Sequence, residues 1–155
     1  MVTLDEIDQQ ILRLLQQDAK MSIKAIAEQL NMTKTPIYER IRKLESSQVI
    51  EKYVALVNAK KMGSSMLVFC SVSLEVQKLT EIELFKAAIR EIPEVMECYL
   101  MGGSNDFLLK VIVTDLDAYH HFSSGKLAAL KNVSKIKSSF VLDVVKKETV
   151  LPEYF

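Results

Sequence analysis

The sequence lacks net charge, long apolar runs and closely spaced cysteines. Twenty basic residues balance twenty acidic ones among 155, so overall charge argues neither for nor against a nucleic-acid partner. No apolar run reaches the roughly 18 residues needed to span a bilayer, and the first residues do not resemble a signal peptide. Cys70 and Cys98 form no C-x-x-C spacing. This gives little support for a disulfide framework or a cysteine zinc site, and it favours a reducing, cytoplasmic compartment.

The sequence also lacks the usual patterns of catalytic and metal sites. His120 and His121 are adjacent, so in a helix their side chains point about 100° apart, and no histidine follows at i+4. An exposed helix face is the favoured interpretation of this pair. No G-x-S-x-G or comparable motif surrounds any serine. We therefore expect no metal, no cofactor and no enzymatic activity.

Charge is distributed unevenly along the chain. Residues 1–61 contain ten basic and eight acidic side chains, a net of +2. Within this region Lys34, Arg40, Arg42 and Lys43 fall in ten residues that contain one acid, Glu39. A short basic element in a neutral protein is typical of a contact with phosphates, although a solvated helix face is the commoner explanation of such a cluster.

The first sixty residues predict three short helices. Asp5 can cap the first and Ser22 the second, while Asn31 tolerates the left-handed conformation of a helix exit. A third helix follows closely, with Thr35 as its cap and Pro36 at its first position. Two short helices joined by so tight a turn form a helix-turn-helix. A generic three-helix packing unit is the alternative.

The third helix has an apolar stripe that determines its outward face. Ile37, Ile41 and Leu44 repeat at helical spacing and face inward. The outward side chains then combine basic donors with a hydroxylated aromatic, which suits phosphates and base edges in a major groove. The predicted DNA-binding residues are Lys34, Thr35, Pro36, Tyr38, Arg40, Arg42 and Lys43. Residues 49–55 could form a strand leading out of this domain.

The second half predicts a different architecture. Residues 58–65 are polar and suggest a linker, and residues 66–74 are apolar and suggest a strand. A helix with Ile82, Phe85 and Ile89 ends before Pro93. Strands at 95–101 and 107–113, a helix opened by Thr114 and Asp117, and a strand within 133–145 follow. This order is the ferredoxin-like βαββαβ arrangement, and the whole chain is an α+β protein.

The predicted sheet needs a partner on one face. Two helices cover only one face of a four-stranded sheet. Residues 66–70 and 107–109 are nevertheless apolar at every position, and therefore on both faces of the sheet. The uncovered face is thus poorly suited to contact with water. A homodimer would bury this face, and it would also present two helix-turn-helix units to a two-fold operator.

The order and spacing of many residues resemble the Lrp/AsnC, or feast/famine, family of transcriptional regulators. The resemblance extends over nearly the whole chain and rests on no single motif. In the first half the matching residues are Asp5, Asp8, Ile11, Leu12, Leu15, Asp18, Ala19, Lys20, Ser22, Arg40, Ile41, Leu44, Glu45, Val49, Ile50 and Tyr53. In the second half they are Gly103, Asp106–Leu109, Ser138–Leu142, Val145, Lys146, Leu151 and Pro152.

The resemblance implies a winged helix-turn-helix over residues 1–61 and a ferredoxin-like, effector-binding and dimerising domain over residues 62–155. The helix-turn-helix would occupy residues 23–42, with residues 36–43 in the recognition helix that binds double-stranded DNA. Dimers of the family often assemble into octamers. Small effectors, usually amino acids, bind near the loop that corresponds to residues 103–106. Ser104 stands where many members carry an acid.

The loop Gly102, Gly103, Ser104, Asn105 and Asp106 has two interpretations. As a hairpin turn, its glycines, asparagine and aspartate would supply positive-φ positions. As an effector site, its two glycines leave backbone N–H groups open to a carboxylate, and Asp106 can accept from an ammonium group. The resemblance favours the second interpretation. Ser138 and Ser139 could add hydroxyl contacts from a neighbouring subunit, and an uncharged amino acid is the expected ligand.

Other functions remain as alternatives to the effector-controlled DNA-binding regulator. One is an architectural DNA-binding regulator that responds to no effector. Another is a small ferredoxin-like enzyme, because fold does not determine function. A third is an interaction module whose helix-turn-helix binds another protein. Salt-dependent retention on DNA separates the DNA-binding functions from the last two.

Overall fold

The computed structural model describes residues 3–63 and 65–152 and confirms the α+β class. The chain divides into two compact units. The first contains the N-terminal helices together with residues 145–152, and the second contains residues 58–144. The C-terminal tail is expected in the second domain, at residues 62–155, whereas the described part of the tail from Val145 onward groups with the first unit.

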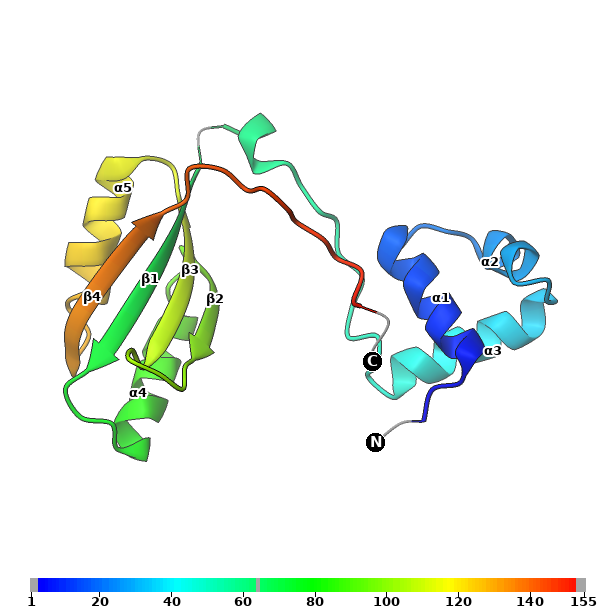
Figure 1. Ribbon diagram of the computed structural model, residues 1–155, viewed down its shortest axis with the longest axis horizontal. Coiled ribbons are helices and arrows are strands. Elements are labelled where there is room, and N and C mark those ends of the chain that lie inside the picture. Colours follow the sequence, from blue (N-terminus) through cyan, green and yellow to red (C-terminus); the bar gives the residue numbers. More distant parts are fainter. Residues whose placement is uncertain (1–2, 64, 153–155) are drawn as a thin grey trace. The chain divides into compact units, whose positions relative to one another are not determined.

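The first unit contains α1 (Glu6–Gln17), α2 (Ile23–Gln29) and α3 (Lys34–Ser46) (Figure 1). The predicted N-caps of α1 and α2 are confirmed: Asp5 Oδ1 accepts from the Asp8 N–H at 2.9 Å, and Ser22 Oγ accepts from the Ala25 N–H at 3.1 Å. Asn31 has φ 52, the left-handed exit that the sequence predicts. The core of this unit consists of Ile11, Ile26, Ala27, Ile37, Ile41 and Leu44.

The start of α3 differs from the prediction. The N-cap is Thr33 instead of Thr35, and the helix begins at Lys34, so Pro36 occupies its third position. Proline fits there because the first four N–H groups of a helix have no partner within the helix, and its ring fixes a helical φ. Thr33 makes no side-chain capping bond, and Thr35 lies inside the helix. The prediction of Thr35 as the cap is therefore wrong.

The strand expected at residues 49–55 is absent from the structure, and with it a β-wing in this segment. The chain instead reverses after α3 through Gln48, which has φ 59. The N–H groups of Val49 and Ile50 both donate to the Leu44 carbonyl, at 3.0 and 3.1 Å. An extended segment becomes a stable strand only when another strand pairs with it, and residues 49–57 pair with none here.

The described part of the C-terminal tail is bound to α1 in the first unit. Thr149 Oγ1 donates to the Gln16 carbonyl at 3.3 Å, and the Leu151 N–H donates to Gln16 Oε1 at 2.9 Å. A groove of about 800 Å³ lies between α1, residues 49–56 and residues 149–152.

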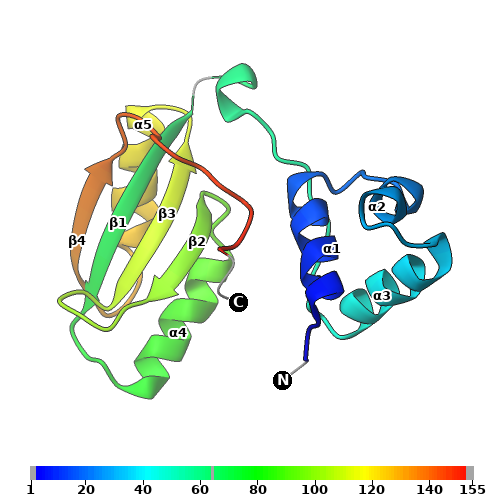
Figure 2. The same ribbon diagram turned by 45° about the vertical axis from the view of Figure 1, so that its right-hand side comes forward.

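The second unit follows the predicted ferredoxin-like order (Figures 1 and 2). A short 3₁₀ turn, Ala59–Lys61, lies in the linker region. The sheet is formed by β1 (Met66–Leu74), β2 (Val95–Leu100), β3 (Phe107–Val113) and β4 (Val133–Phe140), in the order β2-β3-β1-β4 with every pair antiparallel. The helices are α4 (Leu79–Arg90) and α5 (Leu116–His120), and α5 continues as the π-helix His121–Leu127. The N-cap of α5 is Asp115, one residue after the predicted Thr114.

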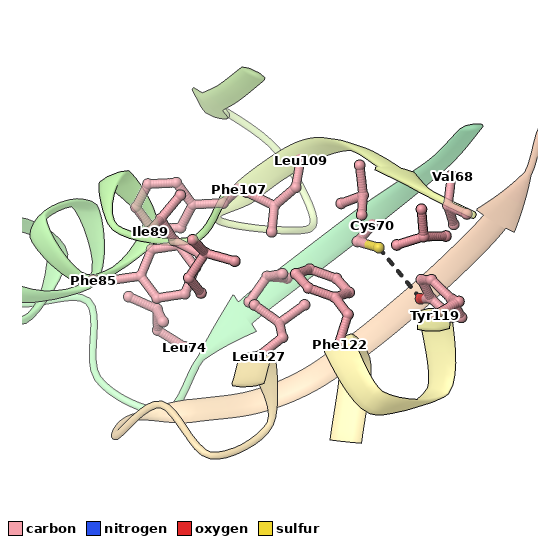
Figure 3. Packing of buried hydrophobic residues seen from close by; sticks show 14 residues of the cluster. Val68, Cys70, Leu74, Phe85, Ile89, Phe107, Leu109, Tyr119, Phe122 and Leu127 are labelled. Carbon is pink, nitrogen blue, oxygen red and sulfur yellow. Dashed lines mark hydrogen bonds between the residues drawn. The ribbon is translucent and has the colours of Figure 1, made fainter. Parts of the chain in front are cut away.

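Both helices cover one face of the sheet (Figures 1 and 2). The core between these two layers is shown in Figure 3. Phe85 of α4 packs on Phe107 of β3 with ring centroids 4.4 Å apart. Tyr119 of α5 reaches Cys70 of β1, whose Sγ lies 3.3 Å from the tyrosine hydroxyl. Cys70 is fully buried, and this burial raises the pKa of its thiol.

The opposite face of the sheet has an apolar centre, as the sequence predicts. Because side chains alternate along a strand, Leu67, Phe69, Leu108 and Ile112 point away from the buried helix side and are half-buried. Their neighbours include the ion pair between Lys110 Nζ and Glu97 Oε1, at 2.6 Å. This face therefore combines an apolar centre with a paired charge, and among the described residues of this unit no helix covers it.

Candidate DNA-binding surface and effector region

The helix-turn-helix is held by short-range contacts between α2 and α3. The Met32 N–H donates to the Ala27 carbonyl at 2.9 Å across the turn, and the small Ala27 side chain is buried where the two helices approach each other. The left-handed Asn31 lies between them and reverses the chain. These features fix the start of α3 with respect to α2.

The buried stripe of α3 orients its other side chains. Ile37, Ile41 and Leu44 are buried, which confirms the predicted inner face. Lys34, Thr35, Tyr38, Arg42 and Lys43 are exposed, whereas Pro36 is half-buried. The Arg42 guanidinium carbon lies 5.9 Å from the centre of the Tyr38 ring, within the range of a cation–π contact. The exposed face of α3 thus brings three cations and a phenol together.

Arg40 differs from the other members of the predicted set. Its Nη1 donates to Asp5 Oδ2 at 2.6 Å and to Asp8 Oδ1 at 2.7 Å, both at the start of α1. The two carboxylates raise the pKa of the guanidinium. Its side chain is 29% exposed, so the expectation that Arg40 points outward with Arg42 does not describe its position.

The segment after α3 is fastened to the helix by Tyr53. Its hydroxyl donates to Glu45 Oε1 at 2.9 Å. Burial, followed by the nearby Glu45 carboxylate, raises the pKa of Tyr53 to about 12. Lys52 and Glu51 are exposed in this segment.

The predicted effector loop connects β2 to β3, and Gly102, Gly103 and Ser104 are exposed. A Cβ atom added at either glycine would meet no atom within 4 Å, so the backbone there is open to a ligand. The prediction of positive-φ residues in this loop is wrong: in the described residues such values occur only at Asn31, Gln48, Gly63 and Asn132. The loop is long enough to reverse the chain without left-handed residues, which a two-residue hairpin would require.

Asp106 is engaged by its own domain. Its Oδ2 accepts from the Leu74 N–H at 2.7 Å and from Gln77 Nε2 at 3.5 Å. Its backbone N–H donates to the Val72 carbonyl at 3.0 Å. The carboxylate therefore ties the end of β1 to the loop, a role that the sequence analysis missed because it depends on a contact between residues 32 positions apart.

Ser138 and Ser139 do not share a surface. Ser138 lies opposite Cys70 on the helix side of the sheet and hydrogen-bonds to the Tyr119 hydroxyl. Ser139 is the next residue of β4 and points to the other face. The two hydroxyls therefore lie on opposite faces of the sheet, and the contacts that they could make with an effector of a neighbouring subunit stay a prediction.

His120 and His121 are exposed on the helix, with ring centroids 6.1 Å apart. Across residues 3–63 and 65–152 no group of three or more His, Cys, Asp or Glu side chains could hold a metal ion. In the same residues, no helix has the length and apolar character to cross a membrane.

Each of the two units matches a known protein domain. Residues 4–45 match the AsnC-type helix-turn-helix domain, and residues 67–151 match the Lrp/AsnC ligand binding domain. The chain belongs to the Lrp/AsnC family of transcriptional regulators. The resemblance stated from the sequence is thereby confirmed, as is the function of a DNA-binding transcriptional regulator.

Three relatives illustrate the similarity. The Bkd operon transcriptional regulator of Pseudomonas aeruginosa is 37% identical over 98% of this chain and 99% of its own. The leucine-responsive regulatory protein of Escherichia coli K12 is 34% identical over 96% of this chain and 90% of its own. A transcriptional regulator from Neisseria meningitidis, solved as a complex with L-Met, superposes with a TM-score of 0.92 at 31% identity and 98% coverage of both chains.

Proposed function

We propose that this family member regulates transcription by binding double-stranded DNA sequence-specifically through the exposed face of α3, and that an amino acid modulates its DNA binding or assembly. The observation that supports DNA binding most directly is the exposed set on α3 opposite its buried stripe. Lys34, Arg42 and Lys43 are cations on a short helix that follows a tight turn. A recognition helix presents such donors to the major groove.

Within this surface the side chains have different roles. Arg42 can donate two parallel bonds to a guanine edge, and the Tyr38 ring beside it restricts the orientation of its guanidinium. Lys34 and Lys43, near the two ends of α3, suit phosphates on either side of the groove. Thr35 and the half-buried Pro36 lie in the first turn, where they can contact the backbone or a thymine methyl group.

Selection from a random duplex pool tests the DNA-binding part. The full chain is expected to enrich one sequence with two-fold symmetry, and its affinity for that duplex should fall steeply with salt because phosphate contacts release counterions. Ala substitutions of Arg42 and Lys43 should weaken this binding. If affinity is independent of salt and insensitive to both substitutions, α3 does not bind DNA.

The loop at 102–106 is the proposed effector region. Its exposed glycine backbone can donate to a carboxylate, and the second oxygen of Asp106 can accept from an ammonium group. The L-Met complex of the Neisseria relative is consistent with an uncharged amino acid. Calorimetry of the full chain against each of the twenty amino acids should show heat with at least one. No heat with any of them would favour an architectural regulator without an effector.

A homodimer is the proposed assembly unit, from which larger assemblies such as octamers can be built. The apolar residues on the open face of the sheet support it, because a face with Leu67, Phe69, Leu108 and Ile112 is better covered by a second copy than by water. A dimer also supplies two recognition helices for a two-fold operator.

An enzymatic function is not favoured. An acid or base in such an enzyme would have to come from Asp106 or the two histidines, and Asp106 already uses one carboxylate oxygen to accept from the Leu74 N–H. His120 and His121 lie exposed on a helix surface. The proposed partner also favours the cytoplasm, where a regulator meets DNA.

A further inference from the structure

Arg40 joins the middle of α3 to the first turn of α1. A single nitrogen, Nη1, donates to Asp5 Oδ2 at 2.6 Å and to Asp8 Oδ1 at 2.7 Å. The side chain of Asp8 is 6% exposed and that of Asp5 is 54% exposed. One carboxylate therefore lies inside the unit and the other at its surface, with the guanidinium between them.

The same two aspartates cap α1. Asp5 Oδ1 accepts from the Asp8 N–H at 2.9 Å, and Asp8 Oδ2 accepts from the Asp5 N–H at 3.3 Å. Each carboxylate thus uses one oxygen for the helix cap and the other for Arg40. Because all four oxygens are engaged, the carboxylates cannot rotate without breaking either the cap or the contact with α3.

This arrangement fixes α3 more strictly than apolar packing can. Contacts between Ile11, Ile37 and Ile41 are non-directional, so they tolerate small rotations and shifts of one helix on another. Charge-assisted hydrogen bonds have defined lengths and directions. Arg40 also lies between Tyr38 and Arg42 in sequence, so its anchorage sets where those two side chains are presented.

We propose that Arg40 is a positioning residue of the recognition helix, which holds α3 on the two capping aspartates of α1 and thereby sets DNA affinity without contacting DNA. This inference rests on the proposed DNA binding through α3. It predicts that residues on α1, away from the exposed face of α3, control DNA affinity.

The direction in which one substitution changes DNA affinity distinguishes a positioning role of Arg40 from direct contact with DNA. Asp8→Asn removes a negative charge, so electrostatics alone would strengthen DNA binding. It would also release Arg40, which would strengthen binding further if Arg40 contacts phosphate. Positioning predicts the opposite, since an amide cannot accept from both Arg40 and the Asp5 N–H through its two terminal atoms.

The experiment uses the full chain and a labelled duplex that the wild type selects from a random pool, titrated by fluorescence anisotropy at several salt concentrations. Asp8→Asn and Arg40→Gln are expected to weaken binding about tenfold, with the slope of log affinity against log salt unchanged. Glu6→Gln, an exposed acid in the same helical turn, is the matched control and should leave affinity equal or slightly higher. Lys43→Gln should reduce the slope by about 1.

Asp5→Asn provides a second test in case Asp8→Asn, at the buried carboxylate, prevents folding. Asn is as good an N-cap as Asp, and this residue is exposed, so folding should be retained. Positioning predicts a several-fold loss of affinity with the salt slope unchanged. Tighter binding by Asp5→Asn or Asp8→Asn, or a slope reduced by about 1 in Arg40→Gln, would overturn the inference. Failure of the wild type to bind any duplex would instead overturn the proposed function.

Discussion

The Asp106 carboxylate is expected to have two roles, which substitutions at this residue can separate: it holds the loop against the end of β1, and it binds the ammonium group of an effector. Its Oδ2 accepts from the Leu74 N–H at 2.7 Å, and Leu74 is 3% exposed, so water cannot readily replace this acceptor. Asp106→Ala leaves the buried donor unsatisfied, which costs about 1–3 kcal/mol. Asp106→Asn keeps an oxygen acceptor in the same place and is expected to cost less than about 1 kcal/mol.

Urea denaturation of the full chain, followed by circular dichroism, measures the free energy of unfolding for both variants. Asp117→Asn, an exposed aspartate in the first turn of α5, is the control for loss of charge and should have little effect. Calorimetry with the amino acid that binds the wild type then measures the effector role. Asp106→Asn should lose most of the binding heat, because its side chain no longer carries the negative charge that attracts an ammonium group.

Two results would refute this reasoning in different ways. Equal stability of Asp106→Ala and the wild type would show that the bond to Leu74 contributes nothing. Undiminished effector binding by the stable Asp106→Asn variant would show that the carboxylate charge has no role in recognition, and the loop would then be a connection between two strands.

Four further outcomes are expected. Arg42→Ala should cost about 1–3 kcal/mol of DNA binding and relax sequence preference at one position, and a selection experiment on the variant measures both. Lys43→Ala should weaken binding to all duplexes alike, as competition with random DNA will show. Phe69→Asp on the open sheet face should convert the protein to a monomer in light scattering. The hydrogen bond from the Asp8 N–H, followed by that from Arg40, lowers the pKa of Asp5. The ionised carboxylate therefore stabilises the fold above its ordinary pKa of 3.8, and this stabilisation is lost as pH falls through the lowered value. Acid unfolding of Asp5→Asn should lack this pH-dependent loss of stability.

Several details of the fold could be predicted where local chemistry determines the backbone. The caps at Asp5 and Ser22 and the left-handed Asn31 depend on neighbours within a few residues. The alternation of β3 is buried at Phe107, Leu109, Val111 and Val113, as expected for a strand with one face on helices. The strand at 49–55 failed for the opposite reason, because apolar, extended-looking residues need a pairing partner that the single chain does not provide.

The effector region was harder to predict because its contacts are distant in sequence. Asp106 meets Leu74, and Ser138 meets Tyr119, through the pairing of strands and the packing of α5 on the sheet. Composition identified the loop as glycine-rich and polar, but it could not reveal that one carboxylate oxygen was already in use. Composition also says nothing about which face of the sheet each serine of β4 occupies. The alternation of side chains along a strand does, because it places the adjacent residues Ser138 and Ser139 on opposite faces.

The position of Arg40 was, in contrast, available from helical spacing alone. Arg40 is three residues after Ile37 and four before Leu44, so it lies on the same side of α3 as the buried stripe rather than opposite it. A cation on an inner face requires an anion that faces it, since an unpaired buried charge is costly. The carboxylates of Asp5 and Asp8, three residues apart at the start of α1, have the spacing of a capping box and can meet that requirement. The basic cluster of α3 therefore contains two chemically similar residues with different positions: Arg42 on the exposed face, available to DNA, and Arg40 on the inner side, paired with α1.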